Sequence, residues 1–155
     1  MNKEVFVKRI KKYESILNNH IENKTTWVEE NWFQIENLYE DDSIITIRFV
    51  FDEIRVEIGI VQECYSDKYE GMEFENGFSK FLKLLSCKIK RQEHIKGKYP
   101  FKVNYYFENN GVFELFGTAM THISFKFWKK TLIKTNIQKP IVESDLIIKE
   151  LNEIK

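Results

Sequence analysis

Residues 45–60 read ITIRFVFDEIRVEIGI, in which an apolar side chain occupies every second position on both sides of Asp52-Glu53. Such alternation is typical of a β-strand with one buried face. The two halves therefore predict an antiparallel hairpin, with Asp52 and Glu53 as a two-residue turn and partner residues whose numbers add to 105. Phe49 then faces Val56 on the buried side of the hairpin.

The polar side of this hairpin favours the same register. Arg48 lies opposite Glu57, and a cross-strand pair of opposite charges stabilises a sheet by about 0.2–1 kcal/mol. Asp-Glu is a poor sequence for the tight turns that need positive φ angles, so a longer loop is the alternative.

Two helices are expected before the hairpin. In the first, over about residues 3–22, apolar side chains recur every three or four positions: Phe6, Ile10, Tyr13, Leu17 and Ile21. The second helix should begin at a capping box, in which Thr26 is the N-cap and Glu29 the third helical residue, and should continue to about Leu38. Together they predict two short antiparallel helices.

Five further elements are expected after the hairpin. They are a helix over about 76–94, two hairpin strands at 101–107 and 113–115, a strand at 123–127, and a helix after Ser144. The second hairpin should turn through a three-residue loop that ends at Gly111, in the left-handed region. Residues 130–142 carry no assignment, because Pro140 interrupts them.

This order of elements, ααββαβββα, defines an α+β fold. We expect a single domain over residues 1–155, with an antiparallel sheet of about five strands covered on one face by helices. Aromatic residues make up 15% of the chain, and that content of apolar surface excludes a disordered protein.

Cysteine usage and the N-terminus indicate the compartment. Cys64 and Cys87 form no CxxC pair, and the first residues lack the apolar core of a signal peptide. No apolar run approaches the roughly 18 residues that a membrane span needs. We therefore expect a cytoplasmic protein that does not enter a membrane.

The histidines His20, His94 and His122 share no metal-binding spacing with one another or with a cysteine. The sequence also lacks the glycine-rich and nucleophile motifs of common enzymes. We expect no metal, no cofactor and no catalytic activity. The alternative is a ribonuclease-like site built from His94, His122 and Lys126.

A formal net charge of zero hides two long segments of opposite sign. Residues 22–75 carry four Lys or Arg against fifteen Asp or Glu, a net charge of −11. Residues 76–139 carry thirteen Lys or Arg against three Glu, a net charge of +10. Fields of this kind act on the choice of partner and on the association rate. Charge is therefore the strongest indication of function in this sequence.

The acidic segment supplies the predicted partner-binding surface. Its members are Glu40, Asp41, Asp42, Asp67, Glu70, Glu73 and Glu75. Carboxylates on such a surface can occupy the sites that a basic partner uses for phosphates. A solvated acidic face, neutralised by the basic segment of the same chain, is the alternative.

The basic segment supports two other interpretations. Lys80, Lys83, Lys90 and Arg91 lie in or beside the expected basic helix, with aromatic residues at 99–106. Lysines and aromatic rings together can bind single-stranded nucleic acid. Self-association is the third interpretation, in which the acidic surface of one copy meets the basic surface of another.

In size, order of elements, charge and composition, the chain resembles bacterial toxin-immunity proteins of contact-dependent inhibition and polymorphic toxin systems. The composition is that of an AT-rich gene, with twenty Lys to four Arg and a single Ala. The resemblance implies that the protein binds a cognate toxin one to one and blocks its active site. Such toxins are often nucleases. A protein is then the expected partner rather than nucleic acid. Association of two copies into a homodimer is the alternative.

Overall fold

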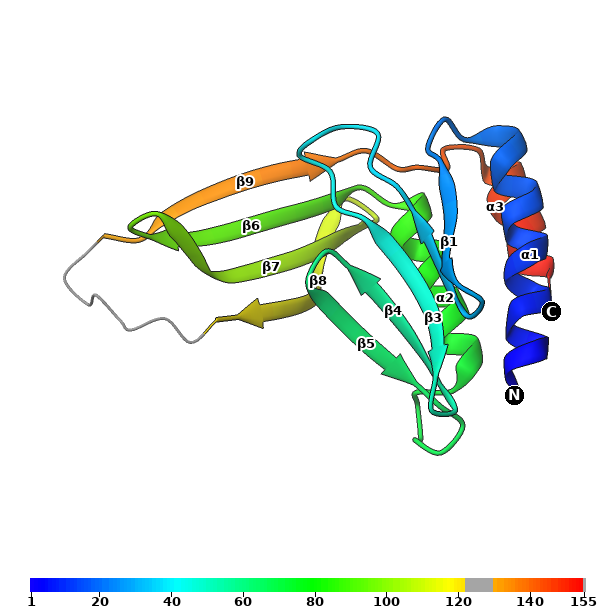
Figure 1. Cartoon of the computed structure of the whole chain (residues 1–155). Helices are drawn as coiled ribbons and strands as arrows, with labels where there is room; N and C mark the ends of the chain where they lie inside the picture. The colour runs from blue at the N-terminus through cyan, green and yellow to red at the C-terminus, as the bar shows by residue number, and fades with distance from the viewer. Residues whose placement is uncertain (122–129, 155) are drawn as a thin grey trace.

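The computed structural model describes residues 1–121 and 130–154, and this part of the chain forms an α+β fold of three helices and two antiparallel sheets (Figure 1). The elements are α1 (Lys3–His20), β1 (Thr25–Glu29), β2 (Trp32–Ile35), β3 (Ile45–Val50), β4 (Glu53–Ile58), β5 (Val61–Tyr65), α2 (Phe74–Ser86), β6 (Ile89–Lys96), β7 (Tyr99–Asn109), β8 (Val112–Met120), β9 (Leu132–Gln138) and α3 (Asp145–Glu153).

The strands divide between two sheets. Sheet A contains β1 to β5 in chain order, and sheet B has the order β8-β7-β6-β9. Figure 1 shows sheet A beside the helices and sheet B extending from them as a separate wing. The expectation of one sheet of about five strands was therefore wrong, because β6 and β9 build a second sheet from residues assigned to a helix or to no element.

The hairpin over residues 45–60 is confirmed, with a turn one residue earlier than expected. Phe51 and Asp52 occupy the turn with φ angles of 51° and 61°, the two positive values of a type I′ turn. Partner numbers consequently add to 103, as in Phe49 opposite Ile54. A shift of two positions keeps each side chain on its side of the hairpin, and the buried face is confirmed for residues 45–49 and 54–58. Phe51 and Ile60, expected on the same face, are instead exposed, at 86% and 64%. Arg48 now lies opposite Arg55.

The helix expected over residues 26–38 is a hairpin, β1 and β2. Phe33 and Ile35 are both buried at a spacing of two, and they pair with Ile47 and Ile45 of β3. Thr26 does not cap a helix; its hydroxyl donates to Glu36, 2.5 Å away. Pairing with β3 overrides the local helical pattern.

The N-terminal helix is confirmed as α1, which Asn2 caps by accepting a hydrogen bond from the Val5 N–H at 3.0 Å. Its buried stripe packs against α2 over one face of sheet A. The rings of Phe6 and Tyr13 each lie 6.1 Å from the ring of Phe78 in α2. This aromatic layer is the centre of the core.

The helix expected over residues 76–94 ends at Ser86, and residues 89–96 form strand β6 instead. Cys87 leaves the helix with extended backbone angles while its N–H still bonds the Lys83 carbonyl. Strand β6 then pairs with β7 on one side and β9 on the other. Since β6 is a central strand, its conformation depends on neighbours that are distant in sequence.

The second hairpin, β7 and β8, turns through two residues rather than three. Asn110 and Gly111 both have positive φ, 49° and 80°, as a type I′ turn requires. A bulge follows, and Phe116 is buried there. The strand expected at 123–127 lies outside the described residues. The last helix is confirmed as α3, although the Ser144 side chain makes no capping hydrogen bond.

Candidate partner-binding site

The structure divides the seven predicted acidic residues into two groups. Glu40, Asp41 and Asp42 belong to the connection between β2 and β3, at one end of sheet A. The other four belong to the segment between β5 and α2 or to the start of α2. That segment lies beside the opposite end of β3, because the Ser66 hydroxyl donates to the Asp52 carbonyl at 3.2 Å. A six-residue strand separates the groups by about 20 Å.

Carboxylates of the second group mostly bind their own chain. Asp67 accepts a hydrogen bond from the Phe74 N–H at 3.2 Å, at the start of α2. Glu73 accepts hydrogen bonds from the Gly71 N–H at 3.1 Å and from the Asn76 amide at 2.7 Å. These bonds hold the segment in shape. Glu70 is exposed and makes no hydrogen bond or ion pair with the described residues.

Glu75 has a structural role that the sequence did not reveal. Its two oxygens accept hydrogen bonds from both terminal nitrogens of Arg9, at 2.6 and 3.0 Å. The Arg9 side chain is only 8% exposed, and its guanidinium lies 3.7 Å from the Phe78 ring centroid. Burial raises the pKa of the neighbouring Tyr13, whose hydroxyl accepts from Arg9 Nε at 3.1 Å. Glu75 therefore neutralises a buried cation.

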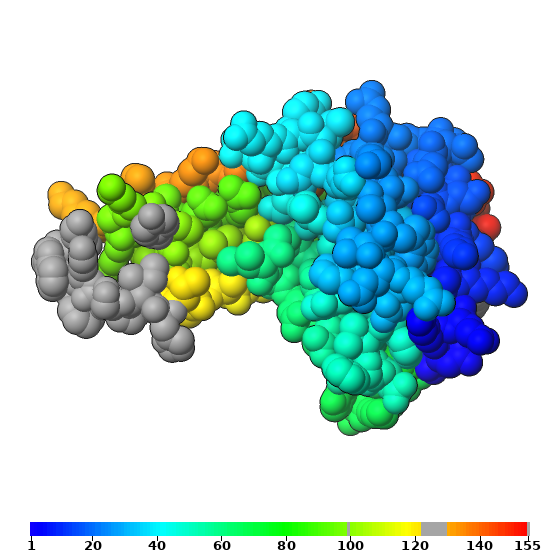
Figure 2. Space-filling view, viewed as in Figure 1, coloured from blue at the N-terminus to red at the C-terminus, as the bar shows by residue number. Residues whose placement is uncertain are grey.

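The first group lies in a longer segment, residues 36–44, which we call the β2–β3 loop. The loop contains Glu36 as well as the three predicted carboxylates, and it exposes the apolar side chains of Leu38, Tyr39 and Ile44, with Tyr39 63% exposed. The space-filling view shows the loop, in cyan, projecting where the wing of sheet B meets the rest of the molecule (Figure 2). Tyrosine is one of the residues enriched at binding hot spots, and the projecting loop places Tyr39 beside carboxylates.

Hydrogen bonds to sheet B fix the base of the β2–β3 loop. The Asp41 carbonyl accepts from Asn136 at 3.0 Å and from Arg91 at 3.3 Å. The Ser43 N–H donates to the Gln138 side chain at 2.9 Å, and the Ser43 and Tyr105 hydroxyls are 3.1 Å apart. An anchored loop loses less conformational entropy when a partner binds.

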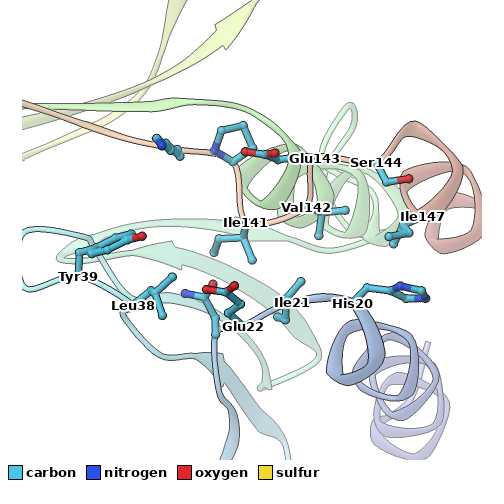
Figure 3. Close-up of a pocket in the computed structure, with 13 residues that line it drawn as sticks. His20, Ile21, Glu22, Leu38, Tyr39, Ile141, Val142, Glu143, Ser144 and Ile147 are labelled. Atoms are coloured by element: carbon cyan, nitrogen blue, oxygen red, sulfur yellow. The ribbon is translucent and has the colours of Figure 1, made fainter.

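Two hollows flank the β2–β3 loop. Leu38 and Tyr39 line a groove of about 410 Å³, which ends at His20 on its other side and has Ile141 and Val142 in its wall (Figure 3). On the opposite side of the loop, a cleft of about 520 Å³ separates sheet A from sheet B. The cleft is lined, among others, by Trp32, Asp42, Glu57, Arg91, Glu93 and Tyr105. The loop is thus a ridge between two concave surfaces.

Asp42 is the partly buried carboxylate among the three predicted ones in the loop. Burial, with a further contribution from Asp41, raises the pKa of Asp42, and Arg91 opposes the increase. Asp41 pairs with Lys134 at 3.5 Å, whereas the Asp42 side chain has no hydrogen bond or ion pair among the described residues. A cation brought by a partner would therefore stabilise ionised Asp42.

The sheet A wall of the cleft is polar and half-buried. Arg48 pairs with Glu57 at 2.6 Å and lies over the Trp32 ring, 4.9 Å from its centroid. The indole N–H of Trp32 is buried and has no acceptor within the described part of the chain. A buried donor without an acceptor is costly.

The four predicted basic residues lie on three different surfaces. Lys80 and Lys83, on α2, hold their ammonium groups over the Phe107 ring, 5.1 and 5.4 Å from its centroid. Lys90 lies over the rings of Tyr106 and Phe113 on the outer face of sheet B, at 4.4 and 4.3 Å. Arg91 points into the cleft and pairs with Glu93 at 3.2 Å. They do not form one basic helix.

The predicted ribonuclease-like set is only partly described. His94 is on β6, where its Nε2 lies 3.3 Å from the Asn104 amide, while His122 and Lys126 lie outside the described residues. Within residues 1–121 and 130–154, no group of three or more His, Cys, Asp or Glu side chains is arranged to hold a metal ion. No helix in the same ranges is long and apolar enough to cross a membrane.

Comparison of the chain with protein families, curated proteins and solved structures gave no match. The class of the protein is therefore defined by the fold and the site alone: an α+β protein of two antiparallel sheets, with an anchored acidic loop between two hollows. Sequence reasoning included Glu40, Asp41 and Asp42 but missed Tyr39. Tyr39 directly precedes these three acidic residues in the sequence, and that position could have identified it as a candidate binding residue.

Proposed function

We propose that the chain is an immunity protein that binds and neutralises a basic toxin, with the β2–β3 loop at the centre of the interface. The observation that carries the proposal is the state of Asp42, a partly buried carboxylate on a projecting, anchored loop that makes no direct ion pair with the described residues. The exposed Tyr39 and Leu38 beside it supply the apolar contact that a stable complex needs.

The two groups of carboxylates are not equivalent in this proposal. Glu75 and Asp67 serve the fold, as their internal hydrogen bonds indicate. Glu40 and Asp41 are exposed and Asp42 is only partly buried, so these three carboxylates can change partner without disturbing the core. A lysine or arginine of the toxin would lie against Asp42, which lines the cleft. By the resemblance to immunity proteins, the toxin is a nuclease and the complex is one to one.

We further infer that residues 1–155 act as a single cytoplasmic domain. Buried apolar residues of both sheets and all three helices belong to one contiguous cluster, which includes Phe33 of sheet A, Phe107 of sheet B and Leu151 of α3. Hydrogen bonds from the β2–β3 loop to sheet B connect the two sheets beside the proposed site. The cluster and these bonds support a rigid interface.

The test is capture of the partner by immobilised protein from a lysate of the organism that encodes it. Wild type is compared with Asp42→Lys and with a matched control, Glu70→Lys. The control makes the same charge change in the second group of acidic residues. We expect a protein that survives nuclease treatment, is lost with Asp42→Lys and is retained by Glu70→Lys. The purified partner should then be toxic when expressed alone and harmless when co-expressed with wild type.

Nucleic-acid binding is the second candidate, and the outer face of sheet B favours it. Lys90, with the Tyr106 and Phe113 rings beneath it, lies on a face that also carries Lys102. Aromatic rings and lysines on an open sheet are the groups that bind single strands. Binding of a single-stranded oligonucleotide that weakens steeply with salt, and is lost with Lys90→Glu, would favour this candidate over the immunity proposal.

A further inference from the structure

Strand β9 is the open edge of sheet B. It pairs with β6 along all seven of its residues, from Ile89 opposite Gln138 to Ile95 opposite Leu132, without a bulge. Within the described residues, nothing bonds to the outer backbone groups of β9. A straight edge strand of this kind is a template for another strand.

The features that usually protect an edge strand are missing from β9. It contains no proline and one charged residue, Lys134. Most of its side chains are exposed, with Leu132 at 65% and both Ile133 and Ile137 at 54%, whereas Gln138 is buried. Exposed β-branched residues on an unpaired edge favour association.

The other edges differ from β9. The pairing of β8 has a bulge between Tyr105 and Tyr106, and Val61 of β5 packs on its face, where a Cβ on Gly117 would come within 2.4 Å of a Val61 methyl group. At the edge of sheet A, the pairing of β1 is irregular between Trp27 and Glu29. The remaining edge, β5, pairs regularly but over only five residues and carries Glu63, so β9 is the longer regular edge among the described strands.

The sequence of β9 is complementary to itself. When a two-fold axis relates two antiparallel edge strands, one residue faces the same residue of the other copy. If that residue is Thr135, every residue of β9 from Leu132 to Gln138 has a partner in the other copy. Ile133 of each copy then faces Ile137 of the other, and Lys134 faces Asn136. An axis at Lys134 would instead place two lysines opposite each other, which is unfavourable.

The β2–β3 loop leaves the isoleucine face uncovered. The loop contacts β9 through Lys134 and Asn136, whose side chains point away from the face that carries Ile133 and Ile137. Asp41 also neutralises Lys134 at 3.5 Å, which reduces the repulsion between two basic sheets.

We propose that β9 is a self-association edge, at which two copies of the chain pair antiparallel about Thr135 and extend sheet B to a continuous sheet across the dimer. Four isoleucines, two from each copy, would form two apolar pairs on the outer face, one on either side of the facing Thr135 residues. This inference is independent of the proposed toxin binding.

The register makes the proposal testable by charge exchange. The double variant Ile133→Lys/Ile137→Lys places lysine opposite lysine twice, whereas Ile133→Lys/Ile137→Glu places lysine opposite glutamate twice. Both variants remove the same two isoleucines from the same exposed positions. Sedimentation of wild type across the micromolar range should show a dimer, which dissociates at least about tenfold more readily with two lysines and is recovered with lysine and glutamate.

A second variant tests the axis itself. With Cys64 and Cys87 replaced by serine, Thr135→Cys should form an intermolecular disulfide on mild oxidation, since directly opposed strand residues lie within disulfide reach. Lys134→Cys is the matched control and should cross-link poorly. A wild-type monomer throughout the range, or a dimer that persists with two lysines, would overturn the proposal. A dimer that high salt dissociates would indicate contact between the acidic and basic surfaces instead, which also overturns it.

Discussion

Individual carboxylates of one acidic segment have different roles in this protein, and their partners distinguish them. Glu75 binds buried Arg9 through two hydrogen bonds, although its own side chain is largely exposed. Asp42 is partly buried and binds nothing in the described chain. The first arrangement stabilises the fold, and the second favours a cation from outside. Sequence alone placed both residues in one predicted surface.

Replacing Glu75 should destabilise the protein. Glu75→Gln leaves the Arg9 guanidinium buried among Tyr13 and Phe78 without its counterion, and we expect the free energy of unfolding to fall by about 1–3 kcal/mol. Urea denaturation measures the change. Glu70→Gln is the control and should alter stability by less than about 0.5 kcal/mol. Equal effects of the two substitutions would contradict the structural role of Glu75.

Replacing Asp42 should have the opposite effect. Because burial raises the pKa of Asp42 in the folded state, the folded protein binds the proton more tightly than the unfolded chain, and ionised Asp42 lowers stability at neutral pH. Asp42→Asn should therefore stabilise the protein at pH 7, by less than about 1 kcal/mol since solvent screens the carboxylate. The gain should vanish as the pH falls below the unfolded pKa of about 3.9, where Asp42 is protonated in both states.

Thermal denaturation between pH 3 and pH 7 would check this expectation, with Asp41→Asn as the control. Asp41 has Lys134 as its partner, so its replacement should give no stabilisation at neutral pH. A stabilising substitution that abolishes partner binding would mark Asp42 as a functional residue. If Asp42→Asn destabilises the protein at pH 7, Asp42 has an internal role instead.

Strands and helices could be predicted from the sequence where the spacing of apolar residues within the segment itself determines the structure. Alternation over residues 45–60 and the helical stripe of α1 predicted both elements and their buried faces. Residues 26–38 also fit a helical stripe, yet Phe33 and Ile35 are held as a strand by β3. Strand β6 similarly depends on β7 and β9. Contacts with distant segments leave no periodic signal in the local sequence.

The turn at residues 51–52 offers a test at the level of the hairpin. Phe51 is 86% exposed and has a positive φ, a conformation that asparagine adopts more readily than phenylalanine. Phe51→Asn should raise the free energy of unfolding by roughly 0.5–1 kcal/mol, while Phe51→Val, which is β-branched, should lower it. Chemical denaturation of both variants would show the difference. A turn at Asp52-Glu53 would instead leave position 51 in the strand and favour valine over asparagine.

The charge segregation of the sequence corresponds to the architecture of the whole molecule. The acidic segment, residues 22–75, contains all of sheet A, and the basic segment, residues 76–139, contains sheet B with most of α2. The sequence predicted this polarity. It could not predict that the β2–β3 loop lies where the two sheets meet, because that position depends on hydrogen bonds between Asp41, Ser43 and strands about 50–95 residues away.

The same arrangement explains which parts of the candidate site were foreseen. Charge patterning found Glu40, Asp41 and Asp42 but grouped them with carboxylates at the other end of sheet A. Trp32 was assigned to a helix, so its place in the cleft wall could not be inferred. Tyr39 became a candidate only once its exposure was known.

The β2–β3 loop as the centre of the interface is tested by one affinity measurement. The captured partner is titrated with Asp42→Lys, with wild type and with Glu70→Lys. With the β2–β3 loop at the centre of the interface, titration calorimetry should show a loss of at least about 2 kcal/mol for Asp42→Lys, as for a hot-spot residue, and a small change for Glu70→Lys. Wild-type binding should also weaken as salt screens the charges. Equal affinity of wild type and Asp42→Lys, or a larger loss with Glu70→Lys, would contradict the assignment of the interface to this loop.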